Sequence, residues 1–254
     1  MLTNTFIHIP NINELAEKEL WDNNILTWED LLSNPLSQIV LGDKYKPVRE
    51  FIVLSQEHLL NNDISFFKRL MSPDEMWRLY KHFKDKVAYL DIETTNIIAG
   101  KGDVTVIGIY NGREVKEFVH GRNLHDFVKE VLNYELLVTF NGSKFDIPFL
   151  KHYFKDNISL DHAHIDLRFF LKRLGFRGGL KRIEKEFGIA RDNEVKNLTG
   201  YDAVCLWNRY KKGDQASLDL LIKYNTEDIV NLEFLMKKGY ELMVEQLLPS
   251  TNLL

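Results

Sequence analysis

Two carboxylates lie in the segment YLDIETTN, residues 89–96, where an otherwise apolar strand runs into polar residues. Asp91 and Glu93 are two positions apart, so on a strand they point to the same face, roughly 7 Å from one another along it. Two like charges on one face of an apolar strand are costly unless a cation lies between them, and a divalent cation is the usual partner. The pair therefore predicts a metal site if other acids reach the same place.

A further acid lies in the segment TFNGSKFDIPFL. Asp146 follows an apolar stretch at residues 136–140 and a turn that begins with Asn141 and a glycine, and it leads into an apolar helix. Open α/β sheets bind their ligands at the carboxyl ends of their strands. We therefore expect Asp146 at the same place as Asp91 and Glu93.

The segment KYNTEDIVNLEFL supplies the last acid. Tyr224 and Asp228 are four residues apart, so they share one face of a helix, next to apolar residues that face the core. Glu227 is the neighbouring acid. The spacing from Tyr224 favours Asp228 for the site, and we interpret Glu227 as a solvated helix acid.

The elements that must position these acids change in character near residue 85. Apolar residues recur at three- and four-residue spacing before this point, which predicts a small all-α domain at residues 1–84. Its expected helices are 14–21, 27–32, 47–60 and 73–83. The period then changes to two, and strands are expected at 87–92, 103–110, 113–120 and 135–140.

After residue 140 the pattern is mostly helical, with a short strand at 164–166. The expected helices are 147–153, 167–174, 179–187, 201–210 and 217–245. The dipeptide Asn111-Gly112 predicts a hairpin between the second and third strands. A three-strand meander followed by alternating helices and strands is typical of an α/β fold, a mixed sheet with helices on its faces. We assign this domain to residues 85–254.

The three acidic segments carry a resemblance when they are read in order. The pattern is Asp91-x-Glu93, then Asn141-x-x-x-Phe145-Asp146, then Tyr224-x-x-x-Asp228. It resembles the DEDD exonuclease superfamily of the ribonuclease H-like fold, and the tyrosine is similar to that of its DEDDy branch. Stand-alone YprB-like proteins look closest, and the motifs also resemble the proofreading domain of family B DNA polymerases. The resemblance covers roughly residues 85–245.

The resemblance implies a metal-dependent 3′–5′ exonuclease that hydrolyses phosphodiester bonds at single-stranded DNA or RNA ends, with DNA slightly favoured. Two divalent cations, Mg²⁺ or Mn²⁺, would stabilise the attacking and leaving oxygens. By analogy Asp91 would bridge both ions, Glu93 and Asp228 would bind the ion that activates water, and Asp146 would reach the second through water. Tyr224 would orient the attacking water.

The resemblance also suggests contacts with the substrate. It would put Thr94 near the terminal nucleotide, Asn141 beside the scissile bond, and the ring of Phe145 at the end of the strand, where it could stack on a base. The segment from 167 to 191 is strongly basic, and Arg177 and Lys181 are its best candidates for phosphate contacts.

Two alternatives stay open at this point. The chain could be a catalytically inactive module that binds nucleic acid or a protein partner, or it could be an endonuclease that cuts a structured substrate. The sequence keeps the complete set of acids together with Tyr224, which argues against a catalytically inactive site.

His162, His164 and Asp166 alternate in the segment DHAHIDLRFF, so they could share one strand face as metal ligands. We predict instead that Asp166 caps the following helix and that the two histidines are structural or exposed.

The N-terminal stretch from His8 to Leu32 resembles a helix-hairpin-helix element. That element uses glycines to bring backbone amides to a phosphate, whereas Asn11 and Asn13 stand at the corresponding positions. Acidic residues follow, namely Glu14, Glu17 and Glu19. The pattern favours packing or protein-partner binding over DNA contact, with a core made by Trp21, Ile25, Leu26 and Trp28.

The composition of the chain excludes several classes of protein and of binding site. The net charge of -4 excludes the general basic field of a nonspecific nucleic-acid binder, so any such contact needs a local patch. The single cysteine, Cys205, excludes an internal disulfide and a cysteine-rich zinc site. No apolar run reaches the length of a membrane span, and the first residues do not resemble a signal peptide. We expect a cytoplasmic protein with no membrane partner.

Overall fold

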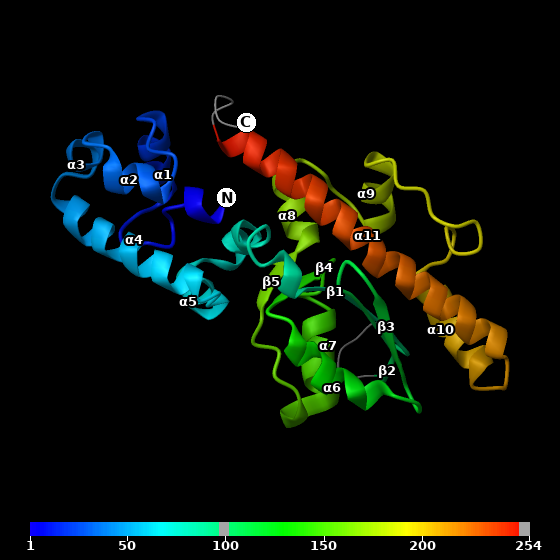
Figure 1. Cartoon of the computed structure of the whole chain (residues 1–254). Helices are drawn as coiled ribbons and strands as arrows, with labels where there is room; N and C mark the ends of the chain where they lie inside the picture. Colours follow the sequence, from blue (N-terminus) through cyan, green and yellow to red (C-terminus); the bar gives the residue numbers. More distant parts are fainter. Residues whose placement is uncertain (97–101, 249–254) are drawn as a thin grey trace. The chain divides into compact units, whose positions relative to one another are not determined.

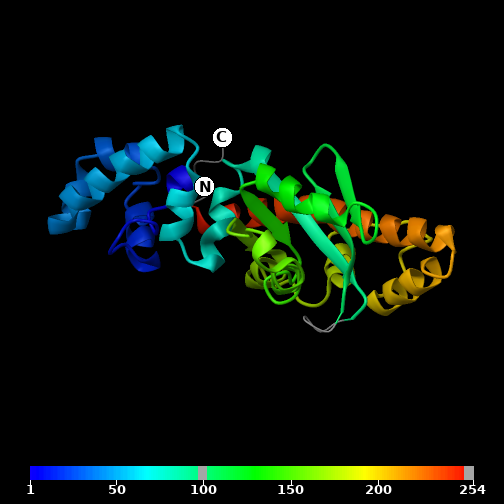
Figure 2. The ribbon, with the colours of Figure 1, turned by 90° about the horizontal axis from the view of Figure 1, so that it is seen from below.

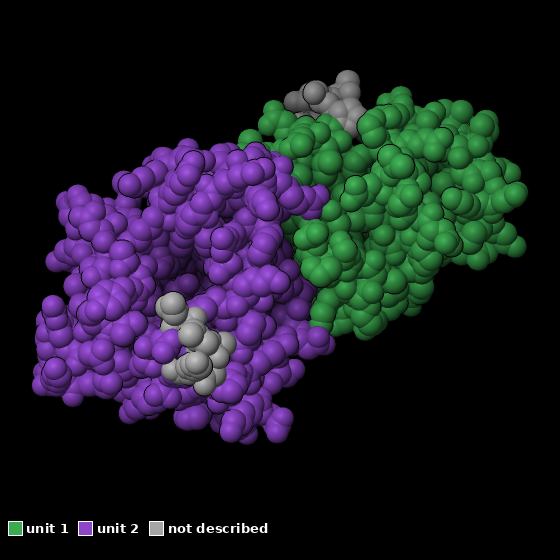
Figure 3. All heavy atoms as spheres, turned by 180° about the vertical axis from the view of Figure 1, so that it is seen from behind, with its two compact units in different colours: residues 1–84, 240–254 green, residues 85–239 purple. Residues whose placement is uncertain are grey.

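A computed structural model describes residues 1–96 and 102–248. The chain divides into two compact units, shown in different colours in Figure 3. Unit 1 comprises Met1–Lys84 and Tyr240–Leu254, and unit 2 comprises Asp85–Gly239. Helix α11, Gln215–Leu247, contributes residues to both units. The domain boundaries expected from the sequence stay a prediction.

Unit 1 is helical within its described residues. Its helices are α1 (Glu14–Asp22), α2 (Trp28–Ser33), α3 (Leu36–Leu41), α4 (Tyr45–Leu60) and α5 (Ile64–Leu70), followed by a 3-10 helix at Pro73–Leu79. The sequence pattern did not predict α3 or α5. The expected core is confirmed, because Trp21, Ile25, Leu26 and Trp28 are all buried.

In the N-terminal stretch that resembles a helix-hairpin-helix element, one of the three acids expected to add negative charge, Glu17, is buried. Asn11 has the left-handed backbone (φ 69°) for which glycine is usually used, and Asn13 caps α1 by accepting a hydrogen bond from the Ala16 amide. Glu17 is 1% exposed, so it adds no negative charge to the surface. The expectation that Glu17 contributes to an acidic surface was therefore wrong.

Glu17 belongs to a buried ionic cluster centred on Arg78. The Arg78 guanidinium lies 3.0 Å from Glu17 and 2.5 Å from Glu75, and it donates a 3.0 Å hydrogen bond to Thr5 Oγ1. Glu17 Oε1 also accepts from Thr5 Oγ1 and from the Phe6 amide, each at 2.6 Å. The charges in this cluster are thus surrounded by hydrogen-bond partners.

Unit 2 is built on a five-stranded mixed sheet with the order β3-β2-β1-β4-β5. The strands are β1 (Val87–Thr94), β2 (Val104–Tyr110), β3 (Val115–Val119), β4 (Leu136–Thr139) and β5 (Ala163–Asp166). β1, β2 and β3 pair antiparallel, whereas β4 is parallel to both β1 and β5. The hairpin between β2 and β3 is confirmed. Its loop is longer than the predicted dipeptide, because Tyr110 pairs with Val115.

Helices cover both faces of this sheet, as Figures 1 and 2 show. α6 (Phe127–Glu130) and α7 (Asp146–Phe154) pack on one face through an apolar core that includes Leu90 and Ile92 of β1. α10 (Gly200–Tyr210) and α11 pack on the other face, against Val106 of β2. Two further helices, α8 (Leu167–Arg173) and α9 (Leu180–Glu186), complete the unit.

The alternation along β1 decides where the acids lie. Leu90 and Ile92 point into the core under α6 and α7, so Asp91 and Glu93 point to the opposite face, the face that α11 covers.

Among the described helices, none combines the length and apolarity that crossing a membrane requires.

Candidate functional site

Three carboxylates from two elements converge on the face of the sheet that α11 covers. Asp91 and Glu93 of β1 and Asp228 of α11 each offer an oxygen, and these oxygens all lie within 4.8 Å of one another. Glu93 and Asp228 are 8% and 6% exposed, and Asp91 is half-buried. We call these three residues the acid cluster. Like charges this close in a buried place require a compensating cation.

Asp146 lies at the edge of the acid cluster, at the first residue of α7. It is 3% exposed, and its Oδ1 accepts a 3.1 Å hydrogen bond from the backbone amide of Ile92, between the two acids of β1. It is not one of the three residues whose oxygens share the 4.8 Å group. The structure therefore brings Asp146 next to β1 without placing it in the same ligand group.

Asn225 is a buried neighbour that the sequence pattern did not single out. Its Nδ2 donates to Asp91 Oδ2 at 2.8 Å and contacts the Asp91 carbonyl oxygen at 3.3 Å. Gly108 of β2 makes room for it, because a Cβ at this glycine would lie 2.0 Å from Asn225 Oδ1. The amide thus fixes the carboxylate of Asp91 and lets α11 approach the sheet closely.

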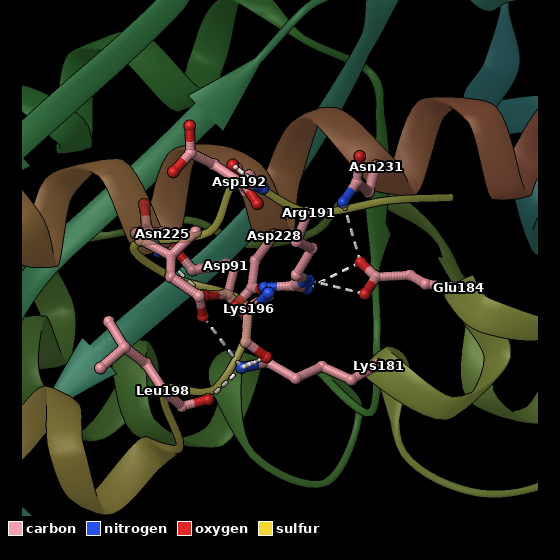
Figure 4. A network of polar contacts seen from close by, with 12 residues as sticks. Asp91, Lys181, Glu184, Arg191, Asp192, Lys196, Leu198, Asn225, Asp228 and Asn231 are labelled. Atoms are coloured by element: carbon pink, nitrogen blue, oxygen red, sulfur yellow. Dashed lines mark hydrogen bonds and ion pairs between the residues drawn. The ribbon is translucent and has the colours of Figure 1, made fainter. Parts of the chain in front are cut away.

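Arg191 supplies the one guanidinium that contacts the acid cluster among the described residues (Figure 4). It forms an ion pair with Asp228 Oδ1, and it binds both oxygens of Glu184 at 2.6 and 2.7 Å. Asn231 donates to the same Glu184 carboxylate at 2.9 Å. The side chains of Arg191 and Glu184 are 4% and 2% exposed, so this is a buried network rather than a solvated face.

Tyr224 and Lys181 lie beside this network. Tyr224 is 8% exposed. Its ring faces the Lys181 ammonium at 4.9 Å and the Arg191 guanidinium at 5.8 Å. The Lys181 ammonium donates to the carbonyl oxygen of Leu198. Lys181 is therefore held by the protein's own backbone and by an aromatic ring.

The electrostatics of the acid cluster are those of an unneutralised site. Burial, followed by the charges of Asp228 and Asp146, raises the pKa of both Asp91 and Glu93 well above the usual range. Burial raises the pKa of Asp146 to about 7, although the Ile92 amide opposes the shift. Burial also raises the pKa of Asp228 to about 6, against the opposing effect of Arg191.

The donor set fits a hard divalent cation. Carboxylate oxygens are the ligands that Mg²⁺ and Mn²⁺ prefer, and neither histidine nor cysteine belongs to the described ligand group. A cation bound there would oppose the effect of burial and, at Asp91 and Glu93, of the neighbouring negative charges that raise these pKa values. Asp91, Glu93 and Asp228 are the residues that would hold it, with Asp146 beside them.

The predicted substrate contacts are spread over separate places. Thr94 is 7% exposed and donates to the Asn96 carbonyl oxygen at 2.7 Å. Asn141 has a left-handed backbone (φ 66°), and its Oδ1 accepts from Arg168 at 2.7 Å. Phe145 is half-buried and packs on the core, with its ring 5.6 Å from that of Phe149. Arg177 is exposed and lines a hollow that also includes Asn141.

The interpretation of the histidine-rich strand is confirmed. Asp166 is the N-cap of α8 and accepts from the Arg168 amide at 3.1 Å. It also accepts from the Asn141 amide at 2.7 Å, so it fixes the turn that leads to Asp146. His162 and His164 are half-buried and hydrogen-bonded to the Val131 carbonyl oxygen and to Thr139, respectively.

Glu227 differs from the predicted solvated acid. Its side chain is half-buried, and its Oε1 accepts a 3.0 Å hydrogen bond from the Asp192 amide. This contact ties α11 to the loop that carries Arg191. The pairing depends on a loop far away in sequence, so helix spacing alone gave no signal for it.

Comparison with known proteins places this geometry in a family. The family model described as the RNase H superfamily matches residues 88–240. A solved structure of the family B DNA polymerase from the hyperthermophilic archaeon Pyrobaculum calidifontis is similar at 21% sequence identity, with a TM-score of 0.44. That similarity covers 63% of this chain and 24% of the polymerase chain, so this chain spans less than two thirds of that protein. No curated protein matches the sequence.

The match reaches from the second residue of β1 through the α11 residues that carry Tyr224 and Asp228. It includes each residue of the acid cluster together with Asp146. The mixed sheet flanked by helices is the ribonuclease H-like fold that the sequence predicted. By its fold and by this match, the chain belongs to the RNase H superfamily.

Proposed function

We propose that this protein is a metal-dependent nuclease that removes nucleotides from the 3′ end of single-stranded nucleic acid, DNA in slight preference to RNA. The observation that carries the proposal is the acid cluster. Three carboxylates from β1 and α11 lie within 4.8 Å of one another at a largely buried place. Burial raises their pKa values, and for Asp91 and Glu93 the charges of Asp228 and Asp146 add to this shift. Superfamily membership and the order of the motifs support the same reaction.

The residues of the acid cluster would hold the metal ions. Arg191 engages Oδ1 of Asp228, so Oδ2 is the oxygen that remains for a cation. Asn225 holds Asp91 from the side of β2, which fixes the carboxylate before any ion arrives. Divalent cations bound there stabilise negative charge on the attacking and leaving oxygens of a phosphodiester.

Tyr224 acts in this proposal as a hydrogen-bond donor that orients water. Burial, followed by the charges of Asp228, Glu93 and Asp91, raises the pKa of its phenol above the ordinary value. The phenol therefore keeps its proton at neutral pH, and it does not serve as a general base. Its ring is fixed between Lys181 and Arg191, so the position of the hydroxyl is set by the fold.

The proposed contacts with the strand surround this centre. Thr94 lies at the end of β1, directly after Glu93, and would contact the terminal nucleotide. Asn141 and Phe145 belong to the turn that leads into Asp146, where the scissile region would lie. The exposed side chain of Arg177 would contact a phosphate of the bound strand. Lys181 would act mainly by positioning the ring of Tyr224.

The test is a degradation assay with 5′-labelled single-stranded DNA and RNA of the same sequence, in Mg²⁺, Mn²⁺ or a chelator. We expect a ladder that shortens from the 3′ end, requires a divalent cation and is absent when the 3′ end is blocked. Asp228→Asn removes one ligand charge and should lower the rate at least ~100-fold. Asp219→Asn makes the same change at an exposed position of α11 and should leave the rate unchanged.

Other results have distinct meanings. Internal cuts that persist with a blocked 3′ end would replace the exonuclease with an endonuclease. Intact substrate in every lane, with the oligonucleotide still bound, would replace it with a binding module. Equal loss of activity in Asp219→Asn and Asp228→Asn would remove the assignment of Asp228.

A further inference from the structure

Unit 2 contains a basic hollow outside the acid cluster. Its volume is about 480 Å³, which is within the range of sites that bind small molecules or nucleotides, ~300–1,000 Å³. Its lining includes four cations and two aromatic residues, namely Lys144, Arg168, Lys172, Arg177, Phe169 and Phe176. We call this feature the basic hollow. No carboxylate is among its described lining residues.

The cations of the basic hollow are not neutralised by the protein. Lys144, Lys172 and Arg177 are exposed, and the described structure gives none of them an ion pair. Arg168 donates to the neutral side chain of Asn141 at 2.7 Å. Asp166, two residues before Arg168, already accepts hydrogen bonds from backbone amides and from Ser143. Clustered like charges of this kind favour a polyanion.

This concentration of positive charge is local. The whole chain has a net charge of -4, so the cations of the hollow do not follow from a basic composition. Three other cations of the same basic segment have partners within the protein: Arg191 binds the buried Glu184 and Asp228, Arg182 pairs with Glu186 at the surface, and Lys181 donates to the Leu198 carbonyl oxygen. Three cations of this segment, Arg168, Lys172 and Arg177, line the hollow instead.

One short turn connects the basic hollow to Asp146, which lies beside the acid cluster. Asn141 and Lys144 line the hollow, and Asp146 begins α7. The Cα atoms of Lys144 and Asp146 are two residues apart, so they are separated by at most about 7 Å. The Phe145 amide donates to the Asn141 carbonyl oxygen at 3.1 Å, which keeps this turn compact. A strand whose end reaches Asp146 would therefore have its next phosphates near the hollow.

We propose that the basic hollow binds the sugar-phosphate backbone of a single-stranded nucleic acid upstream of the end at the acid cluster. Lys144, Lys172 and Arg177 contact successive phosphates, and Arg168 holds Asn141 in place while its charge faces the same backbone. Phe169 is 37% exposed and offers an apolar face to a base or sugar. This assignment rests on the proposed function for the direction of the strand, because it names what holds the substrate behind the cut.

The test compares two triple variants that remove the same charge. The first variant removes the three unpaired positive charges of the basic hollow through the substitutions Lys144→Gln, Lys172→Gln and Arg177→Gln. Lys155→Gln/Lys211→Gln/Lys212→Gln removes three exposed lysines of unit 2 that do not line the hollow. Binding to a fluorescein-labelled DNA strand of about 15 nucleotides is measured by anisotropy at several salt concentrations, in chelator.

We expect the hollow variant to lose about tenfold or more in affinity at low salt, with a salt slope smaller by about 2, since each single-strand phosphate contact contributes ~0.7. The control variant should keep the wild-type slope. Identical slopes and affinities in the two variants would overturn the proposal. Circular dichroism melting of both variants checks that the exposed substitutions leave the fold intact.

A second readout uses substrate length. If the hollow holds the upstream backbone, its variant loses kcat/KM on a strand of about 15 nucleotides and keeps the control's value on one of about 3. Equal losses on both lengths would contradict an upstream site. The binding arm needs no turnover, so a protein that binds through the hollow and never cuts would overturn the proposed function alone. Cutting with no difference in salt slope would overturn the hollow alone.

Discussion

Each unit of this protein buries an arginine among carboxylates, and the two clusters differ in their charge balance. In unit 1, Arg78 faces Glu17 and Glu75. In unit 2, Arg191 binds Glu184 and Asp228, while Asp91, Glu93 and Asp146 lie close by. One guanidinium thus stands against two carboxylates in the first cluster and against five in the second.

The hydrogen bonding differs in the same way. Glu17 accepts from Thr5, from two backbone amides and from Arg78, so its charge is compensated within the fold. In unit 2, Asp91 receives one hydrogen bond from Asn225 Nδ2 and is left beside two other acids. The first cluster is complete as it stands, whereas the second needs cations from outside. Removal of one partner from a buried ion pair is strongly destabilising, and a buried acid that lacks enough partners is a candidate for ligand binding.

The largest effect that this comparison predicts is in unit 1. Arg78→Met removes the guanidinium that faces the two buried carboxylates of Glu17 and Glu75, and it should lower the free energy of unfolding by about 3 to 5 kcal/mol. Intrinsic fluorescence in urea reports mainly on this unit, because three of the four tryptophans, Trp21, Trp28 and Trp77, lie in it. Added Mg²⁺ should not restore the loss. Full recovery with Mg²⁺ would mean that the unit 1 cluster also binds cations.

Arg191→Met is the matched change in unit 2. It unpairs Glu184 and Asp228, which should lower the free energy of unfolding by about 2 to 4 kcal/mol in chelator. Mg²⁺ should recover part of this, because a divalent cation neutralises Asp228 in place of the guanidinium. Thermal melting by circular dichroism, with and without Mg²⁺, measures both values. A loss that is identical in the two conditions would separate Arg191 from the metal site.

Removal of one acid should have opposite signs in the two units. Asp146→Asn keeps an acceptor for the Ile92 amide and removes a buried charge, so it should stabilise the metal-free protein at about pH 8 by on the order of 2 kcal/mol. Glu75→Gln breaks the 2.5 Å ion pair with Arg78 and should destabilise. Urea unfolding in chelator distinguishes the two, and destabilisation by both would remove the contrast between the clusters.

The smallest expected effect is in the pH dependence of metal stabilisation. The carboxyls of Asp146 and Asp228 have folded pKa values of about 7 and about 6, above the ordinary value of 3.8. The folded state therefore binds protons more tightly than the unfolded state, and the stability of the metal-free protein falls as pH rises from about 4 to about 7. Cations and protons compete for the same oxygens.

Mg²⁺ should accordingly raise the melting temperature more at about pH 8 than at about pH 5, by a few degrees for each ~1 kcal/mol of binding. The comparison of the two pH values with and without Mg²⁺ cancels the contribution of Glu17, whose pKa burial also raises. A larger Mg²⁺ effect at the acidic pH would show that the cation binds elsewhere.

Residue spacing within single strands and helices was enough to predict much of the fold of unit 2 and most of the candidate site. The alternation along β1 put Asp91 and Glu93 on one face, and the helical spacing put Tyr224 and Asp228 together, since both periods are fixed by backbone geometry. The cap at Asp166 followed from the same local reasoning. Local patterns were enough wherever a residue's role depended on its own element.

Roles that depend on distant partners could not be predicted. Asn225 reaches Asp91 because Gly108, on another strand, lacks a side chain. Helix spacing puts Glu17 on the same face of α1 as the buried Leu20 and Trp21, but the partner that allows its charge to be buried there, Arg78, lies about 60 residues away in the sequence. Helix α5 was missed because seven residues span too few turns to establish a period.

The most direct test of the central claim is a calorimetric titration of Mn²⁺ into the metal-free protein at about pH 8, with Asp228→Asn and the exposed control Asp219→Asn beside it. The account predicts saturable binding by the wild type and by Asp219→Asn, and a loss of at least about tenfold in affinity in Asp228→Asn. Equal affinity in all three proteins, or no binding by the wild type, would contradict the claim that the acid cluster of β1 and α11 is a divalent-cation site.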